Sequence, residues 1–401
     1  MNNSFHLTRP AVISALGEGL PAHIERLLNP PAETPLSVSD QWVAGKSLAF
    51  GAVNQPLRRF PEGLSESFRS RNNQLLWHAL AQIEDDIAQA KRRFGAERIA
   101  VVMGTSTSGA DENIPLFRRA AGQGGWAEIP FKQAQQLMSA PADFVAEVYG
   151  LHGLCYGIST ACTSGARALM SAARLLRANL CDAVICGGVD TLSHLTINGF
   201  ASLEVLSEGI ANPFSANRNG INIGEAAAVF LLTREADFGE TLPLLGYGAS
   251  SDAYHMSSPR PDGLGAAAAF EAALQHAGLT AGDIGWINLH GTGTLLNDSM
   301  ESAAVAAVFG NETPSTSTKP LTGHTLGAAG ALEAALLWGM VSRRCNPEGR
   351  LPPQVWDGKR DTGLPPIQLT QAGSRWPYPR RIGASSSFAF GGSNAVLIIG
   401  E

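Results

Sequence analysis

The 401-residue chain has little charge. Charged residues make up 16% of it and hydrophobic residues 44%, which excludes the highly charged, weakly hydrophobic composition of disordered chains. The 29 basic and 35 acidic residues give a formal net charge of −6, and no basic stretch indicates a nucleic-acid partner. We expect a compact protein that does not bind nucleic acid, and any acidic partner must meet a local basic patch.

Cysteine is also scarce. The five cysteines are an odd number in a long chain and match no zinc spacing, so the sequence predicts no metal site and a reducing, cytoplasmic setting. They are Cys155, Cys162, Cys181, Cys186 and Cys345.

Long hydrophobic runs are missing as well. The first twenty residues have no charged region followed by an apolar core. The apolar stretch 328–341 is short and is interrupted by Glu333. The sequence therefore predicts neither an export signal nor a membrane span.

Helical and strand patterns alternate along the chain. Apolar residues recur at helical spacing from Asn72 to Phe94, before a short β-rich run at 99–103. A loop-rich stretch extends to about Pro141, and a small-residue helix at 164–179 precedes a buried strand at 183–189. The alternation indicates α/β layers with largely parallel pairing. Two runs at 381–388 and 394–399 flank a Gly-Gly pair and predict a hairpin.

The two halves of the sequence resemble one another. VVMGTSTSG at 101–109 is similar to INLHGTGT at 287–294, and the segment 159–176 is similar to 315–337. These pairs suggest a duplication, with chance similarity among Gly, Ala, Ser and Thr as the alternative. A polar Gly/Pro segment at 234–244 predicts the boundary, which gives halves at 1–240 and 241–401.

Cys162 is the candidate nucleophile. It lies among small residues in GISTACTSGARAL, directly before the predicted helix. A helix N-terminus favours thiolate over thiol, so the position suits nucleophilic attack. The alternative is an inert buried cysteine, which is the interpretation that we give to the other four.

Two histidines and a lysine occupy similar Gly/Thr loops. His290 follows the strand-like WINL, and His324 precedes a second small-residue helix, with Lys319 five residues upstream. Two neutral histidines can donate hydrogen bonds to one carbonyl oxygen, while a lysine fixes their orientation. Glu301 could hold Lys319 in place by opposite charge. Structural loop histidines and surface charges are the alternatives.

The C-terminal segment SSFAFGGSN could contribute an oxyanion site. Phe388 and Phe390 precede two glycines that allow a tight turn with a free backbone N–H. An aromatic side chain there could gate a pocket. Two core aromatics on a hairpin are the alternative.

These motifs together resemble those of the elongating β-ketoacyl-acyl carrier protein synthases, in the same order, from about residue 99 to the C-terminus. A further block, NPFSANRNGINIGEAAAVFLL at 212–232, is similar to the family's Pro-Phe, Arg-Gly and Gly-Glu block. The motifs are ACTSGARAL around Cys162, HGTGT at His290, KPLTGHTLGAAG at Lys319 and His324, and SFAFGGSNAVL at Phe388.

The resemblance implies the thiolase-like fold, an α/β fold of two pseudo-symmetric halves in five layers, α/β/α/β/α, normally in a dimer. It implies decarboxylative condensation, in which Cys162 takes an acyl group from the phosphopantetheine of acyl carrier protein. His290 and His324 would assist decarboxylation of malonyl-carrier protein, supported by Lys319 and Glu301. No metal or freestanding cofactor is implied.

The resemblance also implies further site residues. The backbone N–H groups of Cys162 and Phe390 would form the oxyanion hole, and Thr292 and Thr294 match positions near the malonyl-pantetheine arm. Asp298 is kept, whereas Leu295 and Asn297 replace the usual Pro and Gly. Ser215, Asn219 and Ile221 also depart from the common pattern. Such departures suit a specialised polyene or polyketide-like lipid pathway at least as well as fatty-acid synthesis.

The sequence leaves three alternatives open. A largely non-catalytic chain-length-determining subunit of a ketosynthase heterodimer typically lacks the nucleophile, which argues against that role here. A thiolase would have a second cysteine near its C-terminus, where this chain has FAFGGSN. The dimer could be a homodimer or a heterodimer with a related ketosynthase-like subunit. Arg69 and Arg71, just before the predicted helix at 72, are candidates for carrier docking, with a solvated arginine pair as the alternative.

Overall fold

The structure of the protein is a computed structural model that describes residues 5–401. The first four residues of the N-terminal stretch considered above lie outside the described residues. None of the helices in the described part has the length and hydrophobicity needed to cross a membrane.

The strands of the first half share one pairing pattern. Strand β6 (Ile99–Gly104) runs parallel to β7 (Cys155–Ile158) on one side and to β8 (Ala183–Asp190) on the other. Strand β9 (Ala226–Thr233) pairs antiparallel with β8, and β2 (Ala11–Ser14) pairs antiparallel with β9. The order is therefore β7-β6-β8-β9-β2, and β7 is an edge strand.

The second half repeats this pattern. Strand β11 (Trp286–Asn288) runs parallel to β12 (Pro314–Thr316) and β14 (Ile382–Ala389). Strand β15 (Ser393–Gly400) pairs antiparallel with β14, and β10 (Thr241–Ser251) pairs antiparallel with β15. The order β12-β11-β14-β15-β10 matches that of the first half, strand by strand. The division at 240/241 stays a prediction, which this repetition supports.

A short N-terminal strand joins the two halves. Strand β1 (Phe5–Thr8) pairs antiparallel with β9 on one side and with β10 on the other. The pairings form one 13-stranded sheet. It also includes β3 (Gly17–Glu18) and β13 (Gln368–Leu369), whereas β4 (Ser37–Val43) and β5 (Lys46–Phe50) form a separate hairpin.

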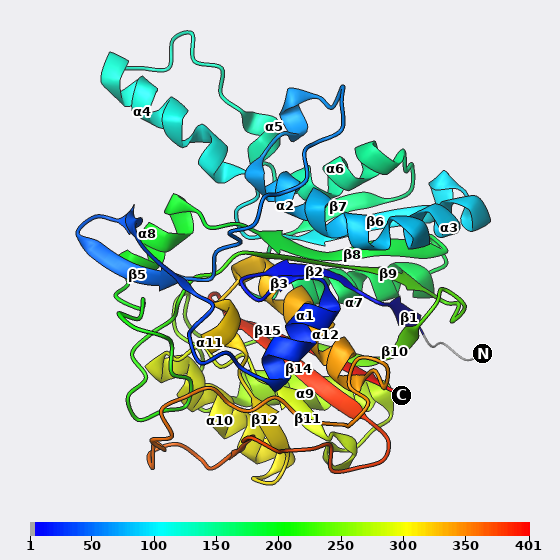
Figure 1. The fold of residues 1–401 in the computed structure, drawn as a ribbon, viewed down its shortest axis with the longest axis vertical. Helices are drawn as coiled ribbons and strands as arrows, with labels where there is room; N and C mark the ends of the chain where they lie inside the picture. Colours follow the sequence, from blue (N-terminus) through cyan, green and yellow to red (C-terminus); the bar gives the residue numbers. More distant parts are fainter. Residues whose placement is uncertain (1–4) are drawn as a thin grey trace.

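Helices cover both halves and fill the space between them (Figure 1). Helices α2 (Arg71–Leu80), α3 (Glu84–Phe94) and α6 (Ala140–Tyr149) cover the first half on the outside, and α9 (Leu264–Ala277) and α10 (Leu295–Phe309) cover the second. Helices α7 (Ser164–Arg177) and α12 (Ala329–Val341) lie between the halves, and α1 (Leu20–Leu28) packs on α12. The fold is therefore the predicted five-layered α/β/α/β/α arrangement.

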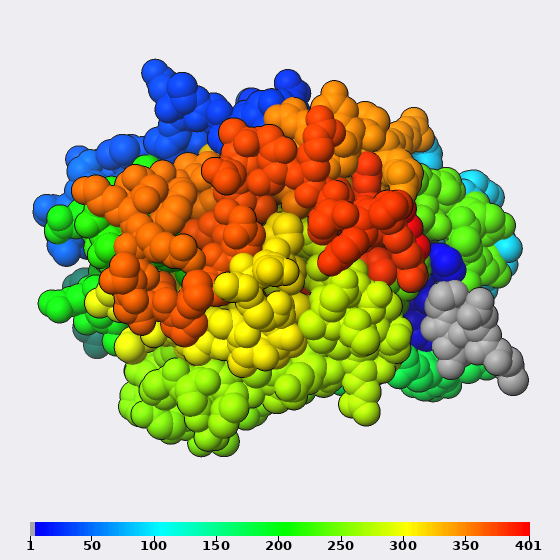
Figure 2. All heavy atoms as spheres, turned by 90° about the horizontal axis from the view of Figure 1, so that it is seen from below, coloured from blue at the N-terminus to red at the C-terminus, as the bar shows by residue number. Residues whose placement is uncertain are grey.

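The long segment 342–381 has little regular structure. It spreads over one face of the molecule, orange to red in Figure 2, beside α9 and α10. The remaining helices are short. They are α4 (Ile114–Gln123), α5 (Gln133–Gln136), α8 (His194–Ser202) and α11 (Lys319–Thr322), together with single 3-10 turns.

Several local predictions are confirmed, and two regions contain detail that the sequence did not predict. The helix at 164–179, the strands at 99–103 and 183–189 and the C-terminal hairpin are present, and the helix at 72–94 is interrupted by a 3-10 turn at Ala81–Ile83. The loop-rich stretch before Pro141 also contains α4, which the sequence did not predict. Only Ala120 is buried in α4, so no buried face leaves a pattern in the sequence.

Nine of the fourteen residues of the helix after Cys162, and all residues of the strand that follows it, are buried. Helix α7 packs on α12, and β8 lies between β6 and β9, so elements of this chain cover the buried residues of both.

Candidate active site

Cys162 lies in a tightly held loop between β7 and α7. Ala161, the residue before it, has a left-handed φ of 51°. The Ser164 hydroxyl accepts a hydrogen bond from the Thr160 N–H at 2.9 Å and donates to the Ala161 carbonyl at 2.6 Å. These bonds fix the turn, so the Cys162 thiol is presented from a rigid loop and is only 7% exposed.

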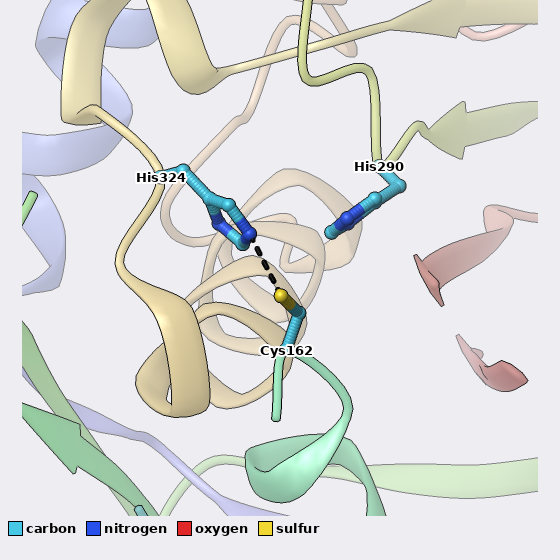
Figure 3. Close-up of side chains that lie close together, drawn as sticks. All are labelled: Cys162, His290 and His324. Carbon is cyan, nitrogen blue, oxygen red and sulfur yellow. Dashed lines mark hydrogen bonds between the residues drawn. The ribbon is translucent and has the colours of Figure 1, made fainter. Parts of the chain in front are cut away.

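His324 reaches the thiol from the second half of the chain. Its backbone N–H donates to the Asn222 carbonyl at 2.7 Å, and its carbonyl accepts from the Gly224 N–H at 2.9 Å. These bonds anchor the loop between α11 and α12. The His324 Nε2 lies 2.9 Å from the Cys162 Sγ (Figure 3), so the two halves of the chain meet at this contact.

His290 completes the group from the end of β11. Glu301 on α10 accepts the backbone N–H groups of His290 and Gly291 at 2.7 and 2.6 Å. The Ser386 hydroxyl bonds both the His290 N–H and Glu301. One ligand atom from each of Cys162, His290 and His324 lies within 4.8 Å of the others. In Figure 3 both rings are directed toward the sulfur.

Lys319 determines which ring nitrogen of His290 carries the proton. Its ammonium donates to the His290 carbonyl oxygen and lies 3.4 Å from the ring Nδ1. Since an ammonium has only donors, Nδ1 must be the acceptor, and the ring proton is on Nε2. His290 therefore offers an N–H donor toward the thiol.

Both histidines are neutral. Burial, with the nearby Lys319 charge, lowers the pKa of His290 and of His324 well below the usual range. A neutral imidazole can accept or donate a proton at Nε2 according to its tautomer. The site therefore holds two uncharged hydrogen-bonding groups beside a thiol.

Burial also disfavours the Cys162 thiolate. It raises the pKa of the thiol to about 12, although Lys319 and the residue's own backbone N–H lower it. That the helix start favours the thiolate stays a prediction, and burial acts in the opposite direction. The thiol needs a proton acceptor, and His324 Nε2 is in contact with it.

The predicted partner of Lys319 is wrong. Lys319 forms its ion pair with Glu333, in the middle of α12, and both side chains are buried. Glu301 instead holds the backbone of the His290 loop, because α10 places its carboxylate beneath that loop. Burial raises the pKa of each of the two carboxyls to about 7.

The sequence contained signals for some of the missed residues. Glu333 is a lone acid in an otherwise apolar helix, and such a residue needs a buried partner. Asp190, at the end of β8, accepts hydrogen bonds from the Ser106 and Gly327 backbone N–H groups at 2.9 and 2.6 Å. It thereby ties the loop after β6 to the start of α12. Nothing in the sequence around Ser386 distinguished it from its serine neighbours.

The predicted threonines and Asp298 lie together beside His290. The hydroxyls of Thr292 and Thr294 are 2.9 Å apart. Asp298 is buried and accepts the backbone N–H groups of Phe214 and Gly293 at 2.8 and 3.1 Å. Burial raises its pKa to about 6. Asp298 therefore holds the loop that carries the threonines.

A cavity of about 280 Å³ leads to the thiol, and both histidines, both threonines and Phe388 line it. Phe390 is 40% exposed, and its ring centroid lies 5.6 Å from that of Phe200 on α8, so the two rings flank the cavity. Within residues 5–401, no carbonyl or side-chain oxygen accepts the backbone N–H of Cys162 or Phe390.

The candidate docking arginines lie outside this cavity. Arg71 begins α2 and forms an ion pair at 2.5 Å with the buried Glu225, while Arg69 donates to the Leu64 carbonyl at 3.1 Å. The charged residues in the cavity lining are Glu204 and Asp252, and no lysine or arginine is among the lining residues.

Cysteine and histidine also bind metals, so the three site residues were considered as a metal site. They are the single group of three or more potential ligands found within residues 5–401. The Lys319 ammonium beside His290 disfavours a second cation there. The geometry is better suited to acyl transfer, with a nucleophile, a proton acceptor and an N–H donor around one point.

Known proteins match this chain along most of its length. Family models described as the N-terminal and C-terminal domains of β-ketoacyl synthase match residues 70–237 and 243–349. Nodulation protein E of Rhizobium meliloti is 33% identical, with 75% of each chain covered. The 3-oxoacyl-[acyl-carrier-protein] synthase 2 of Vibrio cholerae serotype O1 is 32% identical, with 76% of each covered.

Among solved structures, a ketosynthase in complex with its chain length factor from Xenorhabdus doucetiae matches with a TM-score of 0.91. The match has 43% sequence identity and covers 99% of this chain and 98% of that one.

Proposed function

This chain belongs to the β-ketoacyl synthase family, and we propose that it condenses an acyl group carried on Cys162 with malonyl-acyl carrier protein. The observation that carries the proposal is the contact between the Cys162 thiol and His324 Nε2, with the His290 N–H directed at the same point. The product is a 3-oxoacyl-carrier protein, made for a fatty-acid or a specialised polyene or polyketide-like lipid.

In the first half-reaction, His324 Nε2 takes the thiol proton as the Cys162 sulfur attacks the acyl thioester carbonyl. The backbone N–H groups of Cys162 and Phe390 stabilise the oxyanion. The carbon–sulfur bond to the carrier breaks, and the departing pantetheine sulfur takes the proton from His324. Cys162 is left as an acyl thioester.

In the second half-reaction, the malonyl thioester lies beside Thr292 and Thr294. The His290 N–H, with His324 in its Nε2–H tautomer, hydrogen-bonds the thioester carbonyl oxygen, so that this oxygen accepts the charge of the enolate as carbon dioxide leaves. The enolate carbon then attacks the acyl-Cys162 carbonyl. The bond to the Cys162 sulfur breaks, and the released thiolate takes up a proton from solvent water.

Lys319, Glu333, Glu301 and Asp298 position these groups. We propose no metal or cofactor beyond the phosphopantetheine that the carrier brings. The same proposal assigns a cytoplasmic location, two halves divided near residue 240, and a dimer with a second ketosynthase-like chain, which the match to a ketosynthase in complex with its chain length factor supports. Carrier docking near Arg69 and Arg71 is the least supported part, because Glu225 neutralises Arg71.

Intact-protein mass spectrometry after incubation with a panel of acyl-carrier proteins tests the proposal. We expect the mass of one acyl group on the wild-type chain, none on Cys162→Ala, and the 3-oxoacyl product once malonyl-carrier protein is added. Peptide mapping must place the group on Cys162. Acylation at Cys155 or Cys186, or a chain that no carrier acylates, would contradict the proposal, and the second outcome would favour a chain-length-determining subunit.

A further inference from the structure

A second cavity lies apart from the one that leads to Cys162, between the segment 342–381 and helix α10. Its volume is about 290 Å³, and it shares no lining residue with the cavity at the thiol. Its outer wall belongs to the segment that spreads over the face of the molecule shown in Figure 2. We call it the α10 cavity.

Hydrogen bonds to the loop 212–218 hold this outer wall in place. The Asp357 carboxylate accepts from the Ser215 hydroxyl at 2.8 Å and from the Asn217 side-chain amide at 2.6 Å. The Ala216 N–H donates to the Lys359 carbonyl at 2.9 Å. Ser215 is one of the positions that depart from the common family pattern, and an acidic residue there would repel the Asp357 carboxylate. The serine at this position therefore permits the wall.

The inner end of the α10 cavity carries an unpartnered hydroxyl. Ser302, on α10, is 0% exposed and lines the cavity, and its Oγ has no hydrogen-bond partner within residues 5–401. A buried polar group without a partner costs about 1–3 kcal/mol. A ligand with a polar group at this depth would remove that cost.

The outer end carries an unpaired positive charge. Arg360 lines the cavity and is exposed, and its guanidinium has no hydrogen bond or ion pair with any described residue. The other charged lining residue, Asp361, is bound at 2.5 Å by Arg218, which lowers the pKa of this carboxyl. An anionic group at the outer end would therefore pair with Arg360 without a competing carboxylate in the lining.

Aromatic and aliphatic side chains line the cavity between these two ends. Trp356, Phe214 and Ile367 are among them. Phe214 and Ile367 also belong to the buried cluster around α9 and α10, so packing fixes their positions. A side chain at Gly291 would lie 3.0 Å from the Phe214 ring, which shows that this ring also contacts the His290 loop. Such walls favour a ring-shaped apolar ligand.

We propose that the α10 cavity binds a small aromatic carboxylate that carries a second polar group at the end opposite the carboxylate. The carboxylate pairs with Arg360, and the ring lies against Trp356 and Phe214. The second polar group bonds the Ser302 hydroxyl. A neutral aromatic compound lacks the ion pair, and an aliphatic acid lacks the ring contacts. The site goes beyond the proposed function and does not depend on it, because it shares no residue with the condensation site.

The probe is 6-hydroxy-2-naphthoate, whose carboxylate and hydroxyl lie at opposite ends of a flat ring system. Isothermal titration calorimetry at low salt should show one probe bound per chain. Two analogues separate the contacts, since 2-naphthoate lacks the hydroxyl and 2-naphthol lacks the carboxylate. Each should bind about threefold more weakly or worse, the loss expected for one hydrogen bond or one exposed ion pair.

Variants at the two ends of the cavity locate the bound probe. Ser302→Ala should weaken the hydroxynaphthoate about threefold or more and leave 2-naphthoate unchanged, a difference that misfolding would not produce. Arg360→Gln should weaken both acids. Lys359→Gln is the matched control, because it removes the same charge from an adjacent exposed residue outside the lining. Leu296→Trp alters the lining of the substrate cavity instead. Neither control should change the affinity.

Three results would overturn the proposal. The first is no binding to the folded chain at millimolar probe, which would leave a cavity filled by water. The second is equal weakening by Lys359→Gln and Arg360→Gln, which would mean attraction by charge without a site. The third is an affinity that Leu296→Trp changes and Ser302→Ala does not, which would place the probe in the substrate cavity. Circular dichroism verifies that each variant is folded.

Loading of Cys162 by acyl-carrier protein is measured in the same samples. A chain that binds the probe but is not loaded would contradict the proposed function and support this site. A chain that is loaded but does not bind the probe would contradict only the site.

Discussion

The two central helices occupy equivalent places in the two halves and yet differ in burial and charge. Helix α7 begins just after Cys162 and carries three arginines on an open flank. Helix α12 begins just after the His324 loop, is buried on all sides, and carries one acid, Glu333, that is paired internally. The two helices therefore share one role, since each begins beside a site residue. They differ along their length, because α12 is buried on every side and α7 has one uncovered side.

Helices α7 and α12 cross near their first residues, and at the crossing a glycine of each helix lies against the backbone of the other. A side chain at Gly165 of α7 would lie 2.7 Å from the backbone N of Ala331, and one at Gly330 of α12 would lie 2.7 Å from that of Ala166. Such contacts leave room only for glycine. Because Cys162 and His324 immediately precede this crossing, it fixes the distance between them.

The largest expected effect follows from removing the nucleophile just before α7, which separates the role of α7 from that of α12. Cys162→Ala should abolish acyl loading and lower condensation at least about 10³-fold, because no other group in contact with substrate can hold the acyl chain. The folded state should persist, since only one buried sulfur is lost. Mass spectrometry and thermal unfolding measure the two effects. Substantial condensation by this variant would contradict the assignment.

At the start of α12, His324→Ala should slow both half-reactions by roughly 10²-fold or more. Only His324 is in contact with the thiol, so His290→Ala should slow decarboxylation and largely spare acyl loading. With the thiol pKa raised to about 12, loading of the His324 variant should rise about tenfold per pH unit between pH 7 and 9. Single-turnover loading at several pH values measures this. Equal loading rates in the two variants would refute the division of roles.

The charged residues Glu333 on α12 and Arg174 on α7 should contribute differently to the free energy of unfolding. Glu333→Ala leaves Lys319 buried without its partner and should lower the free energy of unfolding by about 3–5 kcal/mol. Arg174→Ala on the open flank of α7 should change it by less than about 1 kcal/mol. Urea unfolding of the chain alone compares them, with Glu333→Gln as a control that keeps the volume. Similar losses would mean that the flank is not open.

The last prediction concerns the point at which α7 and α12 cross, and its expected effect is on stability and turnover. Gly330→Ala meets backbone atoms of α7 and should cost about 1–3 kcal/mol. Gly339→Ala, on the same helix, meets only the side chains of Ile24 and Leu20 among its nearest neighbours, and side chains can move aside more easily than backbone. The first variant should also lower turnover by shifting Cys162 away from His324. If both variants behave alike in unfolding and in turnover, the crossing does not control the site.

The sequence predicted the layers and the convergence of the main site residues because those depend on local patterns and ordered motifs. Cys162, His290 and His324 each follow or precede a strongly patterned element, and parallel strands bring such ends to one edge. The partner of Lys319 was wrong because it depends on which side of α10 and α12 faces the site. Spacing along the chain does not determine that orientation.

Other features could not be read from composition. The apolar character of α7 and β8 does not show whether this chain or a second subunit covers them, and this chain covers nine residues of α7 and all of β8. Helix α4 was missed because its aromatic residue Phe117 packs against Trp126 and Phe131 rather than on the core. In both cases tertiary packing, which a single sequence does not record, determined burial.

Strand β1 has a consequence for how the chain is made. Phe5 pairs with Leu244, a partner synthesised 239 positions later. At about 5–20 residues per second, the ribosome needs roughly 12–48 seconds to produce it. Strand β9, the other partner of β1, is synthesised only shortly before β10. Until β10 and the strands after it are made, α7 has no second sheet to pack against. The nascent first half therefore exposes apolar surface for that interval, which gives chaperones a defined window in which to bind.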